Sequence, residues 1–352
     1  MMYQGVLPET RHAVFERLFT HVPPFRLRQV DQALFVVNVR SFQDMTSLPT
    51  LWRDAMSTES VFVSYRSARV WSSQKQDTFK ALLTLADGKN IETVLMRNAR
   101  GAFTVCVSTQ IGCAMACTFC ATGKMGFSRN LSSDEIVDQV RHWMYFLADH
   151  PDVSARISNI VYMGMGEPLA NYDAVKCSLQ TILKYTDIGP THITVSTVGL
   201  VPMLEQLLDD PLWPPVRLAV SLHSADPKTR KEIMPTSYDD FLEKLAGWTS
   251  RYFMKFDSKR RHLTFEYIML SGINDSPHHA EMLIRFTRRI GKVRVNLIPY
   301  NYTSATFRKS TGSDIDTFQS RLESAGVDVT RRRTMGDDIA AACGQLANQE
   351  TN

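Results

Sequence analysis

Three cysteines near the first third of the chain have a spacing that suits iron-sulfur chemistry. Cys113, Cys117 and Cys120 are separated by three and two residues, within the run CVSTQIGCAMACTFCATGKMGFSRNL at 106–131. Three thiolates can hold three irons of a [4Fe-4S] cube and leave the fourth iron open to another ligand. A structural zinc site would add a second pair of Cys or His nearby, and none follows. The spacing therefore favours a cluster that takes part in chemistry over a zinc knuckle or three unrelated buried thiols.

The segments that must position these cysteines alternate between short apolar runs and helical patterns beyond Gly101. The gaps between the runs are long enough for crossover connections, which indicates parallel βαβ units. Ser132 and Glu135 form a capping box that starts the first helix. The expected strands are 104–108, 157–163, 192–197, 216–223, 263–269 and 293–298. The sequence therefore predicts an α/β fold with a partial (βα)6, TIM-like barrel.

The chain before this core has two kinds of segment. Residues 1–60 carry apolar side chains at helical spacing, interrupted by prolines, and predict a small helical accessory domain. Residues 61–100 alternate apolar and polar side chains around the turn Asp87-Gly88 and predict antiparallel strands. The expected division is a helical domain at 1–60, a β extension or linker at 61–100, the core with its C-terminal segment at 101–346 and a tail at 347–352.

Chemistry in such barrels takes place at the carboxyl ends of the strands. The motifs at these ends are MGMGEP at 163–168, STVG at 196–199, SLH at 221–223 and NLIPYN at 296–301. Gly164 and Gly166 would let a ligand approach the backbone, and Glu167 offers a carboxylate to an ammonium group. A single strand-end histidine such as His223 is more often a core residue. We expect the four motifs to converge on one barrel mouth that faces the cysteine loop.

The composition is that of a globular, soluble protein. The chain has 352 residues, of which 44% are hydrophobic and 22% charged, enough to bury a sizeable core. No apolar run approaches the roughly 18 to 20 residues that span a bilayer, and the N-terminus lacks the regions of a signal peptide. Six cysteines, three of them in one motif, suit a reducing compartment. We therefore expect a cytoplasmic protein without a membrane partner.

The net charge does not decide whether the protein binds nucleic acid. A formal charge of +4 is mild, although local basic clusters could neutralise RNA phosphates. Such clusters can equally be solvated surface. They lie at 259–261, 288–294, 308–309 and 331–333.

From about Arg26 to Leu346 the sequence resembles the RlmN/Cfr family of radical S-adenosylmethionine (SAM) RNA methyltransferases. The motifs that carry the resemblance are VCVSTQIGCAMACTFC, MGMGEPL, SLHS, NLIPYN and GDDIAAACGQL. The resemblance implies a radical SAM barrel with a [4Fe-4S] cluster on Cys113, Cys117 and Cys120. SAM would bind at the open iron. By match to the family, the SAM site includes Gly166, Glu167, Ser196, Ser221, Leu222, His223 and Asn301.

The family methylates a ring carbon of adenine, and the resemblance implies a route with two SAM molecules per turnover. Cys343 takes a methyl group from the first SAM. The second SAM is cleaved to a 5′-deoxyadenosyl radical that removes a hydrogen atom from this methyl, and the resulting methylene radical adds to adenine. Release then needs Glu92 as the base and Cys106 as a second thiol that attacks Cys343, which implies a disulfide bond. Apart from the resemblance, we would interpret Glu92 as a solvent-facing strand residue and Cys106 as a buried strand cysteine.

Pro168 and Asp337 resemble the branch of the family that methylates carbon 2 of an adenosine in 23S ribosomal RNA. Members of this branch can also modify an adenosine in the anticodon loop of tRNA. The alternative within the family is methylation of carbon 8, which confers antibiotic resistance. A more distant alternative is an iron-sulfur protein that binds RNA or senses redox state without methylating, although such a protein has no use for Cys343. The resemblance further implies an electron donor such as flavodoxin or ferredoxin, and we expect a monomer. Cys177 matches no motif and is expected in the core.

Overall fold

Parallel strands form the centre of a ten-stranded sheet. The computed structural model describes residues 7–153, 155–256, 263–304 and 306–348. Six neighbouring strands match the predicted runs to within a few residues, and each pairs in parallel with the next. They are β4 (Phe103–Cys106), β7 (Ile157–Tyr162), β8 (Ile193–Thr197), β9 (Arg217–Ser221), β10 (Leu263–Met269) and β11 (Arg294–Pro299). The sheet stays open between its two edges, so the barrel is partial.

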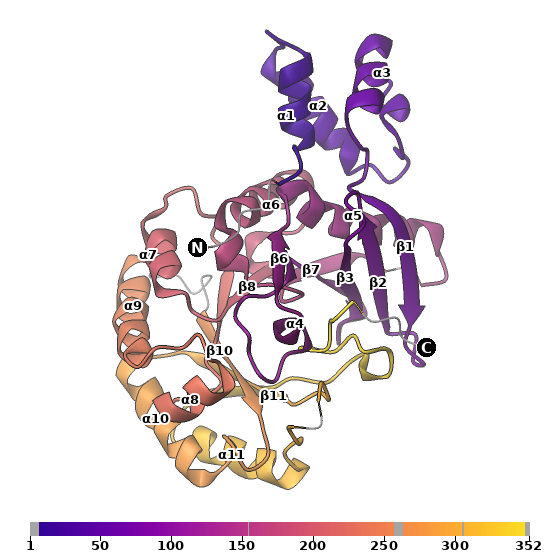
Figure 1. Cartoon of the computed structure of the whole chain (residues 1–352). Coiled ribbons are helices and arrows are strands. Elements are labelled where there is room, and N and C mark those ends of the chain that lie inside the picture. Colours follow the sequence, from indigo (N-terminus) through magenta and orange to yellow (C-terminus); the bar gives the residue numbers. More distant parts are fainter. Residues whose placement is uncertain (1–6, 154, 257–262, 305, 349–352) are drawn as a thin grey trace.

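Helices lie between these strands along the chain and cover the outer face of the sheet (Figure 1). The capping box predicted at Ser132 and Glu135 is present: the amide of Glu135 donates to the Ser132 hydroxyl, and the amide of Ser132 donates to the Glu135 carboxylate. The helices are α5 (Ser133–Asp149), α6 (Tyr172–Tyr185), α7 (Val201–Asp209), α8 (Pro227–Ile233), α9 (Phe241–Lys255), α10 (Pro277–Ile290) and α11 (Gly312–Ser324), with short 3-10 turns at Pro168–Asn171, Pro190–His192 and Asp337–Ile339.

Three strands were not predicted from the sequence. The edge strand β12 (Asp328–Arg331) pairs in parallel with β11 but is short and largely exposed, so no apolar run marks it. A hairpin of β5 (Gln110–Gly112) and β6 (Phe127–Asn130) flanks the cysteine loop and the short helix α4 (Ala121–Lys124). A Cβ on Gly112 would lie 1.8 Å from the carbonyl oxygen of Gly126. Only glycine at position 112 allows the hairpin to close around the loop.

The antiparallel strands predicted for 61–100 extend the barrel sheet instead of forming a separate layer. They are β1 (Tyr65–Ser72), β2 (Thr78–Leu85) and β3 (Asn90–Arg97), and β3 pairs antiparallel with the first barrel strand, β4. In this register Val94 lies opposite Cys106, and Leu82 lies opposite Glu92. Because alternate residues share a face, Glu92, Val94 and Cys106 point to the same side of the sheet.

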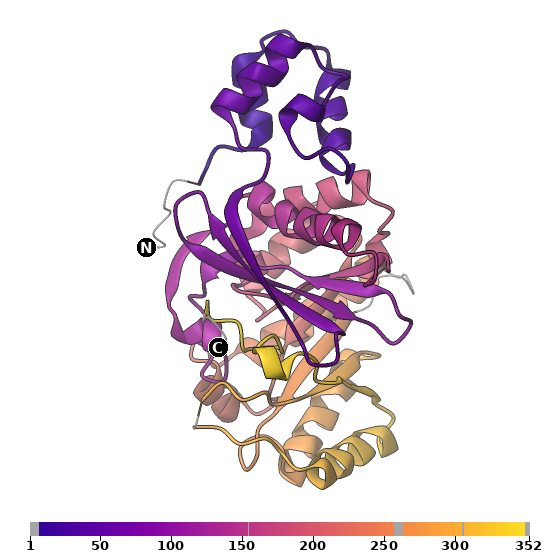
Figure 2. The same cartoon turned by 90° about the vertical axis from the view of Figure 1, so that its right-hand side faces the viewer.

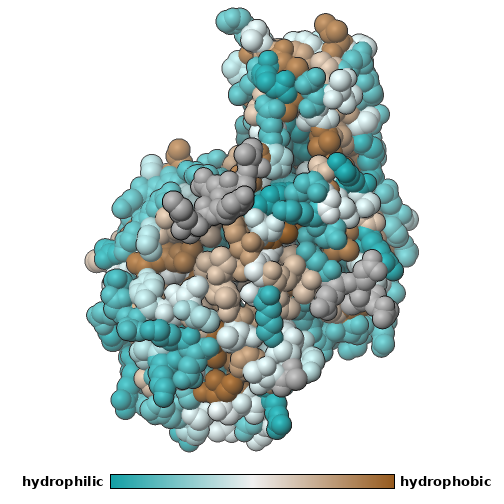
Figure 3. Space-filling view, viewed as in Figure 1, coloured by the Kyte–Doolittle hydropathy of each residue, from teal (hydrophilic) through white to brown (hydrophobic). Residues whose placement is uncertain are grey.

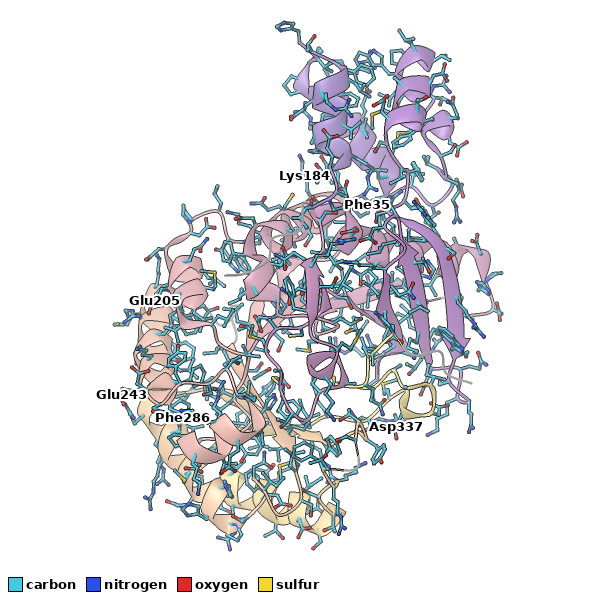
Figure 4. All side chains as sticks on the ribbon, viewed as in Figure 1. Phe35, Lys184, Glu205, Glu243, Phe286 and Asp337 are labelled. Carbon is cyan, nitrogen blue, oxygen red and sulfur yellow. The ribbon has the colours of Figure 1, made fainter. Side chains whose placement is uncertain are left out.

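Helices α1 (Arg11–Leu18), α2 (Pro24–Leu34) and α3 (Thr50–Glu59), with a 3-10 turn at Phe42–Asp44, stand above one end of the barrel (Figures 1 and 2). A buried ion pair joins them to α5, where Nη1 of Arg11 lies 2.8 Å from Oδ2 of Asp138. Burial opposes ionisation of Asp138, but the charges of Arg11 and Arg141 outweigh it and lower the pKa to about 2. Phe35 also stacks on Tyr185 of α6, and Figure 4 shows Phe35 and Lys184 at this junction.

The structure also bears on the predicted position of Cys177 and on the search for a membrane-spanning helix. Cys177 lies on α6 and is exposed, so its predicted core position is wrong; the helix turns its Val175 and Leu179 inward instead. No helix in the described ranges is long and apolar enough to cross a membrane. The basic cluster at 259–261 and the last part of the tail, 349–352, lie outside the described residues.

Candidate active site

The three cysteines of the predicted cluster motif lie around one cavity. Cys113, Cys117 and Cys120 follow β5 and precede α4, and they line a cavity of about 160 Å³. All three are free thiols. Burial raises the pKa of Cys113 to about 12, and burial also raises the pKa of Cys117 and Cys120. Iron binding would replace these protons, because only the thiolate is a ligand.

This donor set fits a cluster better than a single ion. Among the residues described, no three Cys, His, Asp or Glu side chains converge closely enough to hold one metal ion. A zinc knuckle requires such convergence, whereas a [4Fe-4S] cube binds each thiolate through a different iron. The loop is tightly folded at Gly123, where a Cβ would lie 2.9 Å from the carbonyl oxygen of Cys117. Cys113, Cys117 and Cys120 around one cavity are the donor set that a [4Fe-4S] cluster with an open iron would use.

The carboxyl ends of β7, β8, β9, β10 and β11 also line this cavity, so the structure brings all four strand-end motifs to the cysteine loop, the last of them through Ile298. Two expected SAM-binding residues do not line it: Leu222 is buried in the core, and Asn301 lines a neighbouring cavity. The other expected residues do line it; they are Gly166, Glu167, Ser196, Ser221 and His223.

Gly164 and Gly166 make room for the chain after β4. A Cβ on Gly164 would lie 2.7 Å from the carbonyl oxygen of Val107, and a Cβ on Gly166 would lie 2.5 Å from Cβ of Gln110. Gly166 also has a φ of 97°, which disfavours a side chain. The two glycines thus bring the β7 end against the segment that leads into the cysteine loop. This packing role is separate from the ligand approach expected from the sequence.

Glu167 is a buried carboxylate at the wall of the cavity. It accepts hydrogen bonds from the backbone amides of Leu169 at 3.0 Å and Val198 at 2.8 Å. Burial raises its pKa to about 7 in spite of these bonds. An ammonium group bound nearby would favour the ionised form. Glu167 therefore binds two backbone amides in this structure. Its expected contact with the SAM ammonium stays a prediction.

His223 follows β9 in a left-handed backbone conformation, with a φ of 56°. The amide of Ile268 donates to its Nδ1 at 3.1 Å, so this nitrogen carries no proton. Burial and the charge of Arg230 lower the pKa of His223 to about 3. Its ring meets the edge of Phe119 from the cysteine loop, with centroids 4.9 Å apart. The neutral imidazole of His223 thus links the cysteine loop to the barrel. His223 is both a buried core residue and a residue that lines the first cavity.

A second cavity of about 270 Å³ lies next to the first. Cys106 at the end of β4 lines it together with Met96 and Thr104 from the same face of the sheet. Cys343 and Arg332 line both cavities. Figure 3 shows the surface from the same side as Figure 1, and weakly hydrophobic residues gather near the middle of this face. Cys343 therefore stands between the cavity of the cluster cysteines and the cavity of Cys106.

Both of these cysteines are free thiols, so the disulfide expected from the sequence is not formed in this structure. Cys106 is buried and Cys343 is exposed. Burial, together with the nearby Cys343, raises the pKa of Cys106 to about 12, while the charge of Arg332 acts in the opposite direction.

The segment that carries Cys343 is bonded to the cysteine loop and to the barrel. The amide of Ala121 donates to the carbonyl of Gly344 at 2.7 Å, and the Asn301 side chain donates to the carbonyl of Cys343 at 3.1 Å. Asp337, labelled in Figure 4, accepts a hydrogen bond from the Gln345 side chain at 2.6 Å. Asn301 and Asp337 thus share the task of holding this segment.

Glu92 is fully buried, so its interpretation as a solvent-facing residue is wrong. Its Oε1 lies 2.9 Å from Nζ of Lys80, and its Oε2 accepts the amides of Ala347 at 2.8 Å and Asn348 at 3.2 Å. Glu92 lines neither cavity. It is the diagonal neighbour of Cys106 across β3 and β4, a relation that separates side chains by about 7–8 Å. The C-terminal segment covers this carboxylate.

Three charged residues near the site were not predicted from the sequence. Arg332 belongs to the cluster 331–333, which was considered for RNA phosphates, yet its Nη1 lies 3.6 Å from Sγ of Cys343. Its Nε lies 3.6 Å from Oε2 of Glu266, a buried carboxylate at the wall of the first cavity. Lys80 is the third. A charged residue inside a strand pattern, as at Glu266 and Lys80, is the one signal that could have found two of them.

Comparisons with known proteins agree with this arrangement. Residues 107–286 match the Radical SAM superfamily. The chain is 43% identical over 340 residues to "Dual-specificity RNA methyltransferase RlmN" of Desulfotalea psychrophila, covering 94% of this chain and 90% of that protein. It is 41% identical to "Probable dual-specificity RNA methyltransferase RlmN" of Rhodopirellula baltica, covering 92% and 85%. The protein of the same name from Thermosynechococcus vestitus is 39% identical, with 92% of both chains covered.

A solved structure has the same fold. It is a radical SAM methyltransferase from Sphaerobacter thermophilus, which is 36% identical to this chain with a TM-score of 0.87. The match covers 98% of this chain and 100% of the other. The similarity therefore includes the N-terminal helices, the sheet extension and the C-terminal segment as well as the barrel.

Proposed function

Because the chain belongs to the RlmN family of radical SAM RNA methyltransferases, we propose that it methylates carbon 2 of an adenosine in 23S ribosomal RNA. A [4Fe-4S] cluster and SAM are its cofactors. The relatives' name, dual-specificity RNA methyltransferase, supports a second class of RNA substrate, and we propose that this is a tRNA with an adenosine in its anticodon loop. Pro168 and Asp337 support carbon 2 over carbon 8.

The position of Cys343 carries this proposal. It lines both the cavity of the cluster cysteines and the cavity of Cys106. A methyl carrier must meet SAM on one side and the substrate base on the other, so a residue shared by two cavities suits the task. In our proposal Cys113, Cys117 and Cys120 hold the cluster, and the first cavity holds SAM. The second cavity receives the adenine ring.

When bound, the cluster and SAM supply a methyl group, a carbon radical that takes a hydrogen atom from a methyl thioether, and an acceptor for one electron. Sγ of Cys343 accepts the methyl group, and the nearby Arg332 guanidinium donates a hydrogen bond to this sulfur. After the hydrogen atom is lost, the methylene carbon on Cys343 bonds to carbon 2 of adenine. Enzyme and RNA are then joined covalently.

Release uses Cys106 and Glu92 after the adduct has given up one electron. Cys106, a thiol at rest, gives up its proton as its Sγ attacks Sγ of Cys343, and the bond from sulfur to the methylene carbon breaks with its electron pair on carbon. The methylene carbon takes up a proton and becomes the methyl group. Before the bond from sulfur to this carbon breaks, Glu92 accepts the proton from carbon 2, which restores the aromatic ring, so the attack of Cys106 depends on the base. A disulfide between the two cysteines remains, and a cellular dithiol reduces it with two electrons before the next turnover.

The remaining partners follow from this chemistry. SAM cleavage needs a one-electron donor, for which a flavodoxin or ferredoxin is suitable. Ribosomal RNA and tRNA occur in the cytoplasm, where we expect the enzyme to act. We also propose that it acts as a monomer.

The test is the identity of the methylated nucleoside. RNA treated with the reconstituted enzyme, SAM and a reductant is digested, and the nucleosides are separated with mass detection. We expect 2-methyladenosine from the wild type and none from a Cys343→Ala control. A product methylated only at carbon 8 would favour the alternative within the family. RNA binding without any methylated adenosine would favour a non-catalytic iron-sulfur protein.

A further inference from the structure

A buried ion pair outside both cavities joins β2 to β3. Nζ of Lys80 lies 2.9 Å from Oε1 of Glu92, and each side chain is only 1% exposed. Lys and Glu are almost never buried to this extent unless they are paired. Replacing such a pair with apolar residues is often neutral or stabilising, because the desolvation of two charges offsets their attraction. Stability alone therefore gives little reason for the pair.

The surroundings would suit apolar residues at both positions. Lys80 lies opposite Val94, and Glu92 lies opposite Leu82, so the two charges are diagonal neighbours on an otherwise apolar stretch of the sheet. The neighbours Leu82 and Val94 are buried. A Leu or Val at each charged position would continue this packing. The packing of the sheet therefore does not require a charged side chain at position 80 or 92.

The ion pair of Lys80 and Glu92 lies next to Cys106 in the sheet. Val94 is opposite Cys106 on β4, so Glu92 is diagonal to Cys106 as well as to Lys80. Met96 and Cys106, from the same face, line the second cavity, and Leu346 covers that cavity where the chain turns toward Glu92. The amides of Ala347 and Asn348 occupy Oε2 of Glu92. Withdrawal of these two amides would leave that oxygen free to accept a proton.

We propose that Lys80 is a positioning residue for the release step, in which its ammonium is the counter-charge that holds the buried carboxylate of Glu92 in place one diagonal position from Cys106. This inference rests on the proposed function, because it assigns Lys80 to one step of that reaction. When the C-terminal amides withdraw, Lys80 is the counter-charge that stays on Oε1. The ionised carboxylate can then take the proton from carbon 2 of the adenine.

The other groups near Glu92 do not replace this charge. From the C-terminal segment come two neutral amides, and the loop after β7 contributes the sulfur of Met165, which lies 3.4 Å from the Glu92 amide. On β4 the nearest titratable group is the Cys106 thiol. On β1, the Trp71 ring lies 5.3 Å from Nζ of Lys80, and Arg69 lies one strand further away, opposite Leu82. Lys80 is the cation paired with the carboxylate.

The first test variant is Lys80→Met, which keeps the length of the side chain and removes its charge. A buried carboxylate without a counter-charge takes up a proton, so Glu92 can no longer act as a base at neutral pH. We expect Cys343 methylation and SAM cleavage to continue, while release slows by about 100-fold or more, the usual contribution of a positioned base. A covalent protein-RNA adduct should therefore accumulate at neutral pH.

The diagnostic measurement is the pH dependence of release. Raising the pH should ionise Glu92 again and discharge the adduct of Lys80→Met as free methylated RNA. The adduct of Cys106→Ala lacks the attacking thiol and should persist at every pH. Lys80→Gln, which keeps a hydrogen-bond donor at this site, should behave like Lys80→Met and serves if the methionine variant does not fold. Lys89→Met removes an exposed lysine of the β2–β3 turn that bonds to Ser128 and should release product at the wild-type rate.

Two results would overturn the assignment of Lys80. One is free methylated RNA at the wild-type rate from Lys80→Met or Lys80→Gln at neutral pH. The other is an adduct in these variants that alkaline pH does not discharge, since a purely structural role would give that outcome. If Cys106→Ala also forms no adduct and the wild type yields no 2-methyladenosine, the proposed function fails, and the role of Lys80 fails with it.

Discussion

The guanidinium of Arg332 lies 3.6 Å from Sγ of Cys343, at the boundary between the two cavities. The nearby charge of Glu266 raises the pKa of Arg332, so the guanidinium is firmly cationic. Nη1 of Arg332 donates a hydrogen bond to this sulfur and places a positive charge beside it. Arg332 thus stands where the first methyl transfer would need a positive charge.

Replacing Arg332 with Met should slow the reactions of Cys343. A hydrogen bond to a charged group contributes about 1.5–3 kcal/mol, so we expect alkylation of Cys343 by iodoacetamide to slow by about tenfold or more. The fraction of methylated Cys343 in purified protein should fall as well, as measured by mass spectrometry of the peptide. Arg331→Met is the matched control, because Arg331 pairs with Asp316 on the surface. Equal alkylation of both variants would contradict this role.

Replacing Cys113, Cys117 and Cys120 with Ala should remove the cluster without unfolding the chain, because the barrel is built by its strands. We expect loss of bound iron and sulfide after anaerobic reconstitution, with an unchanged circular dichroism spectrum. Cys177→Ala, which alters an exposed cysteine on α6, should retain the metal. Stoichiometric iron and sulfide in the triple variant would show that the cluster is held elsewhere.

Replacing Cys106 with Ala should stop the reaction at the covalent adduct. All steps before release depend on other residues, so a protein-RNA species should survive denaturation and disappear after ribonuclease digestion. The double variant Cys106→Ala/Cys343→Ala lacks the methylene carrier and should form no adduct. A merely structural Cys106 would instead give a stability loss of about 1 kcal/mol with free methylated RNA. Turnover without any crosslink would remove Cys106 from the mechanism.

Replacing Asp138 with Asn should weaken the attachment of the N-terminal helices. The change leaves Arg11 and Arg141 buried without their carboxylate, which typically costs about 3–5 kcal/mol. The lowered pKa of Asp138 means that its contribution is complete above the unfolded value of 3.8 and is lost as the pH falls through about 2. The difference in urea midpoint between wild type and variant should therefore be constant at neutral pH and narrow in acid. Asp316→Asn, at the surface, should change stability by less than about 1 kcal/mol.

The sequence predicted the parts of the fold and site that depend on local pattern. The spacing of Cys113, Cys117 and Cys120 indicated the cluster loop, and apolar runs located the six barrel strands. Strand β12 was not predicted because its four residues are largely exposed. Glu92 and Cys343 were found only through the family resemblance, since neither lies in a pattern of its own. The contacts of Arg332 and Lys80 were not predictable, because both depend on residues distant in sequence.

The bond between Glu92 and Ala347 joins positions 255 residues apart, and the bond between Thr122 and Leu346 joins positions 224 apart. During synthesis the amino-terminal parts of a chain fold first. The barrel can therefore form and load its cofactors on a nascent chain that still lacks the Cys343 segment. The site is complete only when this later segment has joined the barrel. In this order of assembly, methyl transfer cannot begin before the segment that carries Cys343 has been made and has packed against Glu92 and Thr122.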